Sequence, residues 1–295
     1  LIDMNTDKLK DKDIIWADIV FISAMVIQKS SVSQVVDRCK TLGVKTAGGG
    51  PLFTSEADYF NDIDFLILNE GEITIPAFLE DFEAGKTKHI YKTCEYADLK
   101  ATPVPKWELL KTKKYASLNI QYSRGCPYNC DFCDITTLFG KIPRTKNAAQ
   151  LIDELDAIYN SGWRGSVFFV DDNFICNKKH LMNEVLPALT TWMKKHGYPF
   201  NFLTEASINL ADDERLMTMM DEAGFRSVFI GIETPNELSL FECKKNHNAN
   251  RDLIGCVKKI QQHGLEVQGG FIVGFDNDSP GVFNRMVEFI QDSGI

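Results

Sequence analysis

The sequence lacks the features that mark nucleic-acid-binding and membrane-spanning proteins. No run of Lys and Arg is longer than a pair, and 41 acidic against 32 basic residues give a net charge of -9. A nucleic acid is therefore not an expected partner. The most apolar stretch, residues 14–27, is interrupted by Asp18 and is too short to span a bilayer, and the N-terminus has no signal-peptide pattern. We expect a cytoplasmic protein without a transmembrane segment, and peripheral contact with a membrane stays open.

Low-complexity segments are also absent. A hydrophobic content of 44% with 25% charged residues is typical of a globular protein, and 295 residues suffice for two domains or for one large barrel with an appendage. The chain begins with Leu1 and stops directly after a helical pattern. We therefore expect both ends to be incomplete.

The first half alternates between strand and helix patterns. Residues 18–26, 44–51 and 64–68 have strand patterns, and residues 31–42 and 75–84 have helical ones. Strands separated by helices predict a parallel sheet of the Rossmann or flavodoxin-like kind, with ligands at the carboxyl ends of the strands. We predict this domain over residues 1–90, followed by a proline-containing linker over residues 91–114.

A second alternation occupies residues 115–295. It contains five strand patterns, each followed by a helical pattern. Five such units are too few for a closed eight-stranded barrel. We predict an open, partial barrel that lacks its last strand.

Three of the eight cysteines, Cys126, Cys130 and Cys133, lie within eight residues. A disulfide role is disfavoured, because three is an odd number and nothing indicates an oxidising compartment. Zinc normally takes four protein ligands in paired CxxC units, and no second pair exists. Three thiolates suit a 4Fe-4S cluster with one iron left open. The cluster is the favoured interpretation, with zinc or a structural role as the alternatives.

The motif CxxxCxxC, with the aromatic Phe132 directly before the last cysteine and a strand ahead of it, resembles the radical S-adenosylmethionine superfamily. The resemblance covers residues 117–295 and implies a partial (β/α)6 barrel. It also implies that the open iron binds S-adenosylmethionine and that the reduced cluster cleaves this cofactor to a 5'-deoxyadenosyl radical. An external one-electron reductant, such as a flavodoxin or ferredoxin, is then an expected partner.

The same resemblance places S-adenosylmethionine contacts at the ends of successive strands. Candidates are Phe132, Asp171, Asp172, Glu205, Glu233, Gly269, Gly270 and Gly274. A carboxylate beside an ammonium or sulfonium group is electrostatically sensible, and glycines let a backbone approach a flat ring. For Asp171 and Asp172 the alternative is to cap a helix that starts near Asn177. For the two glutamates it is a turn or cap role, and for the glycines a bulge.

The first half resembles the cobalamin-binding domain that precedes many radical S-adenosylmethionine enzymes. The glycines Gly48, Gly49 and Gly50 permit close approach of a backbone to a large ligand, and an ordinary tight turn is the alternative. The sequence D-x-H-x-x-G is missing, so the histidine that binds cobalt from below in some relatives is absent.

Segments such as RGCPYNCDFCDI, VDDNF and GGFIVGFD are similar to the group that includes the hopanoid C-methylases. That resemblance implies a cobalamin-dependent C-methyltransferase that acts on an unactivated carbon of a small molecule or lipid. Alternatives are a cobalamin-dependent radical cyclase, a methylthiotransferase, or an electron-transfer or cobalamin-carrier module without enzymatic activity.

The remaining candidates have simpler interpretations. Arg144 and Lys146, just past the cysteine motif, could serve an anionic group, but we expect them to face water. The scattered thiols have no partner spacing and are expected to be buried or inert; they are Cys39, Cys176, Cys243 and Cys256.

Overall fold

The computed structural model describes residues 1–295, which divide into two compact units, Leu1–Asp98 and Leu99–Ile295. The division falls inside the stretch over residues 91–114 for which the sequence predicts a linker. Part of that stretch packs in the second unit, where Trp107 is buried in the hydrophobic core.

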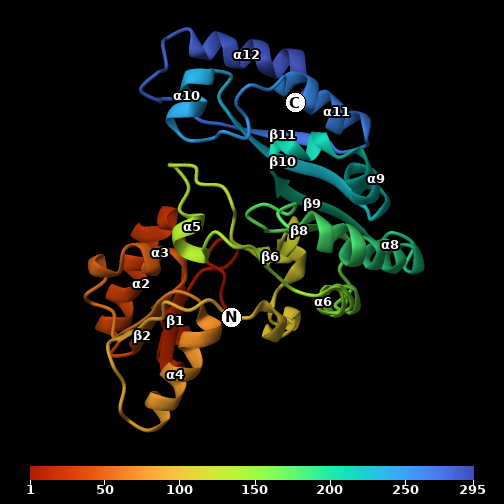
Figure 1. Ribbon diagram of the computed structural model, residues 1–295. Coiled ribbons are helices and arrows are strands. Elements are labelled where there is room, and N and C mark those ends of the chain that lie inside the picture. Colours follow the sequence, from red (N-terminus) through yellow and green to blue (C-terminus); the bar gives the residue numbers. More distant parts are fainter. The chain divides into compact units, whose positions relative to one another are not determined.

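The first unit is built around a parallel sheet with the strand order β1-β2-β3-β4 (Figure 1). Its strands are β1 (Ile19–Ser23), β2 (Lys45–Gly49), β3 (Phe65–Ile67) and β4 (Ile90–Tyr91). Its α-helices are α1 (Asp11–Ile15), α2 (Lys29–Thr41), α3 (Pro51–Ser55) and α4 (Gly71–Glu83). The sequence predicts the first three strands, whereas two-residue β4 is too short to give a pattern.

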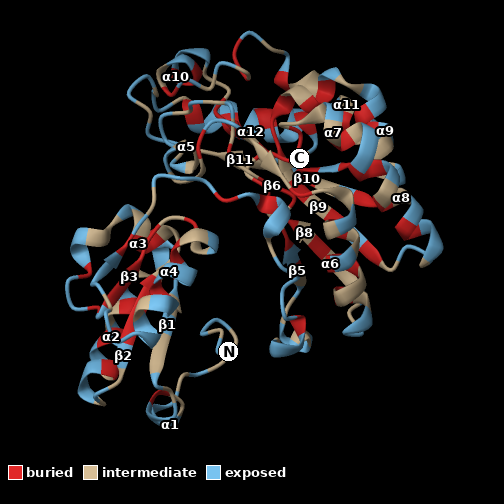
Figure 2. Ribbon diagram, turned by 60° about the horizontal axis from the view of Figure 1, so that its bottom comes forward, coloured by how far each residue is buried: buried red, intermediate tan, exposed pale blue.

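Helices cover both faces of this sheet. Leu66 of β3 packs in one cluster with residues of α2 and α3, while Phe65 and Ile67 pack in another with Phe78 of α4. Alternate residues of a strand point to opposite faces, so β3 is buried on both sides, as parallel strands usually are. Figure 2 shows buried residues along β2 and β3.

The second unit contains a five-stranded parallel sheet in the order β11-β10-β9-β8-β5. Its strands are β5 (Ser117–Ile120), β8 (Gly165–Phe169), β9 (Phe200–Ala206), β10 (Phe225–Glu233) and β11 (Glu266–Phe271). Each new strand lies beside the previous one, and helices fill the crossovers, as in barrel folds. These are the five strands that the sequence predicts, rather than the six of the expected barrel. Closure towards a barrel and the incomplete ends stay predictions.

Five helices of the second unit, α6, α7, α9, α10 and α11, begin at a residue whose side chain caps the helix. At α6, the Asn147 side chain accepts from Gln150 N at 2.9 Å, and Gln150 Oε1 accepts from Asn147 N at 3.1 Å, which is a reciprocal capping box. The α-helices are α5 (Ile135–Phe139), α6 (Ala148–Asn160), α7 (Lys178–His180), α8 (Leu186–Lys195), α9 (Glu214–Glu222), α10 (Glu237–Glu242), α11 (Leu253–Gln262) and α12 (Val282–Ser293). Of these, α5 and α10 are not predicted from the sequence.

The two faces of the five-stranded sheet differ. One face packs in the core of the unit through residues such as Leu118, Val167 and Phe202. The other face carries a row of neighbours in register, Glu205, Phe229 and Gln268, which are at least partly exposed. The side opposite the main core therefore leaves polar and aromatic side chains accessible.

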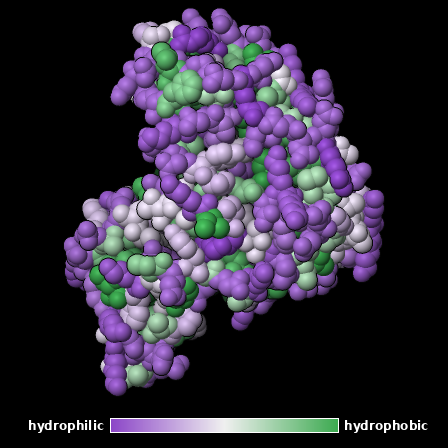
Figure 3. Space-filling model, viewed as in Figure 1, coloured by the Kyte–Doolittle hydropathy of each residue, from purple (hydrophilic) through white to green (hydrophobic).

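The surface drawn in Figure 3 is mostly hydrophilic, with separate hydrophobic patches rather than one continuous band. None of the helices combines the length and the apolar character needed to cross a membrane.

Candidate functional site

The three clustered cysteines lie in a loop closed by a short antiparallel ribbon of β6 (Ser123–Arg124) and β7 (Arg144–Thr145). We call residues 125–143, between these two strands, the cysteine loop. Gly125 opens it with φ 92°, and a Cβ there would lie 2.9 Å from the carbonyl oxygen of Gly140. The amide of Cys126 donates to the same carbonyl at 3.3 Å. Only glycine fits this turn, which sets the direction in which the cysteine loop leaves the ribbon.

The three thiols are free, half-buried and close enough to influence one another. A hydrogen bond from the Cys176 thiol is the largest influence that lowers the pKa of Cys126, to about 7. Burial raises the pKa of Cys130 to about 11 and also raises that of Cys133, and the neighbouring thiols add to both shifts. Mutual repulsion of this kind is relieved when thiolates bind a cationic centre.

The donor set fits a cluster better than a single ion. Structural zinc normally takes four protein ligands, whereas this loop supplies three thiols. In an iron-sulfur cluster each thiolate binds a different iron, so the ligands surround a volume. Three neighbouring free thiols on one loop match that requirement.

Asp171 and Asp172, which follow β8, hold the beginning of the cysteine loop. Asp171 is buried and accepts hydrogen bonds from Tyr122 N at 3.1 Å and from both the amide and the hydroxyl of Ser123. Asp172 accepts from Gly125 N at 3.0 Å. Burial raises the pKa of Asp171 to about 7 and also raises the pKa of Asp172. The second strand of the sheet thus fixes the loop that follows the first.

The alternative that Asp171 and Asp172 cap the next helix is wrong. Asn177 caps α7 itself, because its side chain accepts from His180 N at 3.2 Å. Asp171 already uses both carboxylate oxygens inside the protein, whereas Asp172 accepts from Gly125 N and is less deeply buried.

The two glutamates at the ends of β9 and β10 have different surroundings. Burial raises the pKa of Glu205, and the charge of Asp172 raises it further, so these two carboxylates act on one another. Glu233 instead pairs with Lys245, with 2.7 Å between Oε1 and Nζ. Its φ of 65° is unusual for a residue with a side chain. In the structure, Glu205 therefore lies close enough to Asp172 to feel its charge, whereas Glu233 is paired with Lys245.

Of the three predicted glycines near β11, two have packing reasons to lack a side chain. A Cβ on Gly270 would lie 2.6 Å from the Phe229 ring, and one on Gly269 would lie 3.0 Å from the Phe271 ring. Gly274 has φ 102° and nothing within 4 Å of a Cβ. Its conformation requires glycine, and the space beside it is open. Contact of these glycines with adenine stays a prediction.

The glycine run of the first unit is also explained in part by packing. A Cβ on Gly48 would lie 2.7 Å from the Phe53 ring, and one on Gly49 would lie 3.0 Å from Ile67 O. Gly50 has φ 91° and directly precedes α3. The run therefore forms the turn at the carboxyl end of β2, where ligands of parallel sheets bind.

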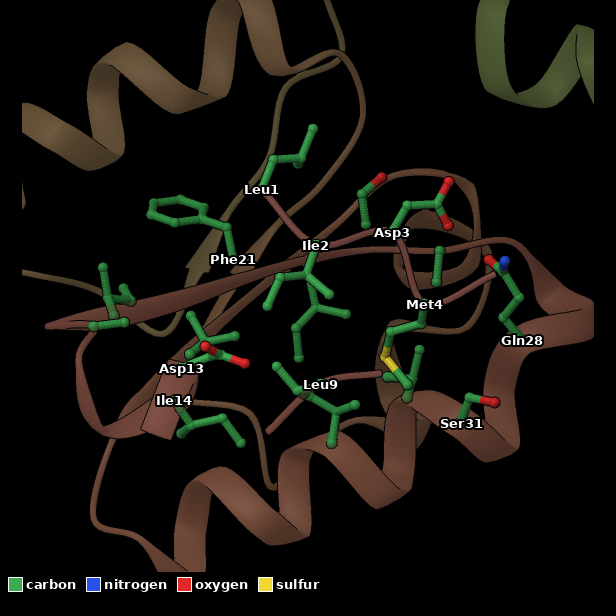
Figure 4. Close-up of a pocket in the computed structure, with 18 of the residues that line it drawn as sticks. Leu1, Ile2, Asp3, Met4, Leu9, Asp13, Ile14, Phe21, Gln28 and Ser31 are labelled. Carbon is green, nitrogen blue, oxygen red and sulfur yellow. The ribbon is translucent and has the colours of Figure 1, made fainter. Parts of the chain in front are cut away.

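A cavity of about 970 Å³ lies beside β1 in the first unit. Figure 4 shows Leu9 and Ile14 on one side of it, Phe21 of β1 on another, and Gln28 and Ser31 near the start of α2. β1 pairs only with β2, so its other edge faces this cavity. The cavity is remote in sequence from the cysteine motif.

Residues 243–248, between α10 and α11, contact the cysteine loop and are not recognised from the sequence as part of the site. We call them the bracing segment. Its Cys243 carbonyl accepts from Asp131 N at 3.0 Å, its His247 ring stacks on Tyr128 with 3.9 Å between centroids, and its Lys245 ammonium lies 5.7 Å from the centroid of the Phe132 ring. The KKNH letters carry no motif signal, because their role depends on contacts more than 100 residues away in the chain.

Two expectations about nearby residues are wrong. Lys146 does not face water: it is buried and paired with Glu154 of α6. Cys176 is not an inert, isolated thiol, because it hydrogen-bonds to Cys126. Sequence spacing gives no sign of either partner. Cys126 follows β5 whereas Cys176 follows β8, and Lys146 and Glu154 lie eight residues apart across the start of α6, where a lysine usually faces water.

The family model of the radical SAM superfamily matches residues 120–290 of the chain. An uncharacterised methyltransferase of Synechocystis is 45% identical over 297 residues, covering 100% of this chain and 55% of that protein. The hopanoid C-2 methylase of Rhodopseudomonas palustris is 37% identical over 298 residues, covering 100% of this chain and 56% of the methylase. The chain thus spans a little over half the length of these two relatives.

Solved structures show the same fold at low sequence identity. The radical S-adenosylmethionine methyltransferase TsrM from Kitasatospora setae, with cobalamin and a 4Fe-4S cluster bound, has a TM-score of 0.78 at 13% identity, covering 96% of this chain and 64% of that one. The cobalamin-dependent S-adenosylmethionine radical enzyme OxsB, with aqua-cobalamin bound, has a TM-score of 0.76 at 17% identity, covering 95% of this chain and 44% of that one.

Proposed function

The chain belongs to the radical SAM superfamily, and on that premise we propose that it acts in cobalamin-dependent methyl transfer from S-adenosylmethionine to an unactivated carbon of a small molecule or lipid. The observation that carries the proposal is the set of three free, mutually interacting thiols, Cys126, Cys130 and Cys133, beside the carboxyl end of the first strand of the five-stranded sheet. The names of the relatives, methyltransferase and hopanoid C-2 methylase, support the methyl-transfer part.

Cys126, Cys130 and Cys133 would hold a 4Fe-4S cluster with one open iron, reduced by a one-electron donor such as a flavodoxin or ferredoxin. When bound, the cluster and S-adenosylmethionine supply a carbon-centred radical, and cobalamin supplies the methyl group. The Cys126 thiol, with its pKa lowered to about 7, is the one most readily ionised before assembly. Gly125 and Asp172 fix the strand-side end of the loop, so the first thiol starts from a defined position.

Asp172 and Glu205 are the carboxylates best arranged for the ammonium group of S-adenosylmethionine. Burial raises the pKa of both, and Asp172 also raises the pKa of Glu205. A cation between them would oppose both shifts, so the pair favours a positively charged ligand. Asp171 serves better as a brace, because backbone amides and Ser123 occupy its oxygens. Contacts of Phe132, Glu233 and the β11 glycines with the cofactor stay predictions.

The first unit would hold cobalamin at the carboxyl ends of its strands. Gly50 makes the turn there, and its φ of 91° lets the backbone change direction without a side chain in the way. The likeness of fold to TsrM and OxsB, both solved with cobalamin bound, supports the use of this cofactor.

The test is anaerobic purification followed by turnover. We expect about four iron and four sulfide per chain by the cluster stoichiometry, bound cobalamin, and formation of both 5'-deoxyadenosine and S-adenosylhomocysteine when S-adenosylmethionine and a reductant are added with substrate. Formation of 5'-deoxyadenosine without S-adenosylhomocysteine, even with methylcobalamin supplied, would contradict methyl transfer and favour a radical reaction of another type.

Matched variants separate the parts of the proposal. A triple replacement of Cys126, Cys130 and Cys133 by alanine should remove iron and both products, whereas Cys94→Ala, at an exposed thiol of the first unit, should keep them. Asp172→Asn should weaken S-adenosylmethionine binding while iron content stays normal. Unchanged activity in the triple variant would point to a carrier module without radical chemistry.

A further inference from the structure

The bracing segment is fixed by hydrogen bonds to β10 and to the cysteine loop. Asn248 donates to the carbonyls of Gly231 and Ile232 at 2.9 and 3.1 Å, which ties the segment to the end of β10. Lys244 has φ 56°, a conformation that costs a residue with a side chain free energy and persists only where its surroundings impose it. The segment therefore acts as a rigid support for the cysteine loop.

Lys245 is the charged residue that this support places beside the loop. Its side chain is 12% exposed and that of its partner Glu233 is 9% exposed. A Cβ on Gly231 would overlap the Glu233 carboxylate and lie 2.8 Å from Lys245 Nζ. The lack of a side chain at Gly231 thus leaves room for the ion pair between Lys245 and Glu233. The pair is largely buried at the end of β10 and is not a surface contact.

The positive end of this pair points towards the cysteine loop. Lys245 Nζ lies 5.7 Å from the centroid of the Phe132 ring, next to Cys133 in the chain. Lys245 thus places a largely buried ammonium group beside the residue that precedes a proposed cluster ligand.

We propose that Lys245 is a positioning residue that holds a fixed positive charge beside the cluster and makes the cluster easier to reduce. The inference rests on the proposed cluster but not on cobalamin or methyl transfer. Reduction adds one electron to a centre already bound by three thiolates, and a nearby cation stabilises the more negative state. Lys245 would therefore help the reductant to deliver the electron that the enzyme needs.

The experiment is a redox titration of anaerobically purified protein, followed by electron paramagnetic resonance of the reduced cluster, without S-adenosylmethionine. In Lys245→Met we expect the ratio of reduced to oxidised cluster at a fixed solution potential to fall about tenfold, which is a shift of about 59 mV to more negative potential for one electron. Lys245→Arg, which keeps the charge, should restore most of the ratio.

Two further variants control for structural damage. Lys244→Met removes the neighbouring lysine, whose pair with Asp131 of the same loop is 55% and 48% exposed, and should leave the potential unchanged because solvent screens that charge. The double variant Glu233→Gln with Lys245→Met avoids an unpaired buried carboxylate and should still show the lowered potential.

The outcomes are distinguishable. Wild-type protein that binds no cluster overturns the proposed function together with this inference. A cluster at normal iron content whose potential is the same in wild type and Lys245→Met overturns this inference alone. Equal shifts in Lys244→Met and Lys245→Met do so as well. A weaker binding of S-adenosylmethionine in Lys245→Met with an unchanged potential would make Lys245 a ligand of that cofactor instead.

Discussion

Replacement of Lys146 by methionine should destabilise the second unit in a way that depends on pH. The Lys146 and Glu154 side chains are 7% and 2% exposed and form an ion pair, and the second carboxylate oxygen of Glu154 has no hydrogen-bond partner. Burial raises the pKa of Glu154, although Lys146 opposes the rise. Without Lys146, the carboxylate would be left buried and unpaired.

The size of the effect follows from the proton that Glu154 must then take up. In the unfolded chain a glutamate has a pKa of about 4.3, so keeping it protonated in the folded state at pH 7 costs about 1.36 kcal/mol for each of about 2.7 pH units, or about 3.7 kcal/mol. This agrees with the 3–5 kcal/mol typical of a broken buried ion pair. For a unit of this size we expect the melting temperature to fall by about 7 to 15 °C.

The sign of the pH dependence is fixed by the same reasoning. A carboxyl group whose pKa is higher in the folded state favours folding below its unfolded pKa and opposes folding as the pH rises above it. The loss of stability in Lys146→Met should therefore shrink to about 1 kcal/mol at pH 5. Urea unfolding of wild type and variant at pH 5, 6 and 7 measures this difference in the free energy of unfolding. An equal loss at all three values would refute the electrostatic explanation.

Two controls test the burial argument. The double variant Lys146→Met with Glu154→Leu removes both charges and should recover most of the lost stability, because a well-packed apolar pair can replace a buried ion pair. Lys259→Met breaks a more exposed pair with Glu214 and should show no comparable pH dependence, since exposed ion pairs contribute little.

The sequence is sufficient to predict the parts of the site that depend on neighbours in the chain. The spacing of Cys126, Cys130 and Cys133 is local, and the structure keeps the three thiols together on one loop. The strand β9 also has the bounds that its alternating residues predict, because one face of it packs in the core while the other holds Glu205. Period-two patterns report such burial directly.

The parts that could not be predicted depend on contacts between distant segments. Nothing in the letters around Asp171 and Asp172 says which carboxylate turns inward, since that depends on where the amides of residues 122, 123 and 125 lie. Lys146 resembles a surface lysine in sequence, and its partner Glu154 lies on the next helix. Lys245 follows an identical residue, and only the fold leaves Lys244 in an exposed pair with Asp131 while it buries Lys245 against Glu233.

Three further predictions test the structure at separate points. Gly48→Ala should lower stability by about 1–3 kcal/mol even without cobalamin, because its Cβ would press on the Phe53 ring; a loss seen only with cobalamin present would favour ligand contact instead. Asp212→Asn should lower the free energy of unfolding by at most about 1 kcal/mol near neutral pH. Asp212 pairs with Arg251 at 2.7 and 2.8 Å, and this pairing lowers the pKa of Asp212. The contribution of the pair should therefore disappear as the pH falls below about 4. Asp171→Asn should lower the free energy of unfolding by about 2–3 kcal/mol. The NH2 group of the asparagine would face backbone or hydroxyl donors that now meet a carboxylate oxygen. The start of the cysteine loop would then be held less tightly, and the iron content after reconstitution should fall. Normal iron content together with normal stability in that variant would show that Asp171 does not hold the loop.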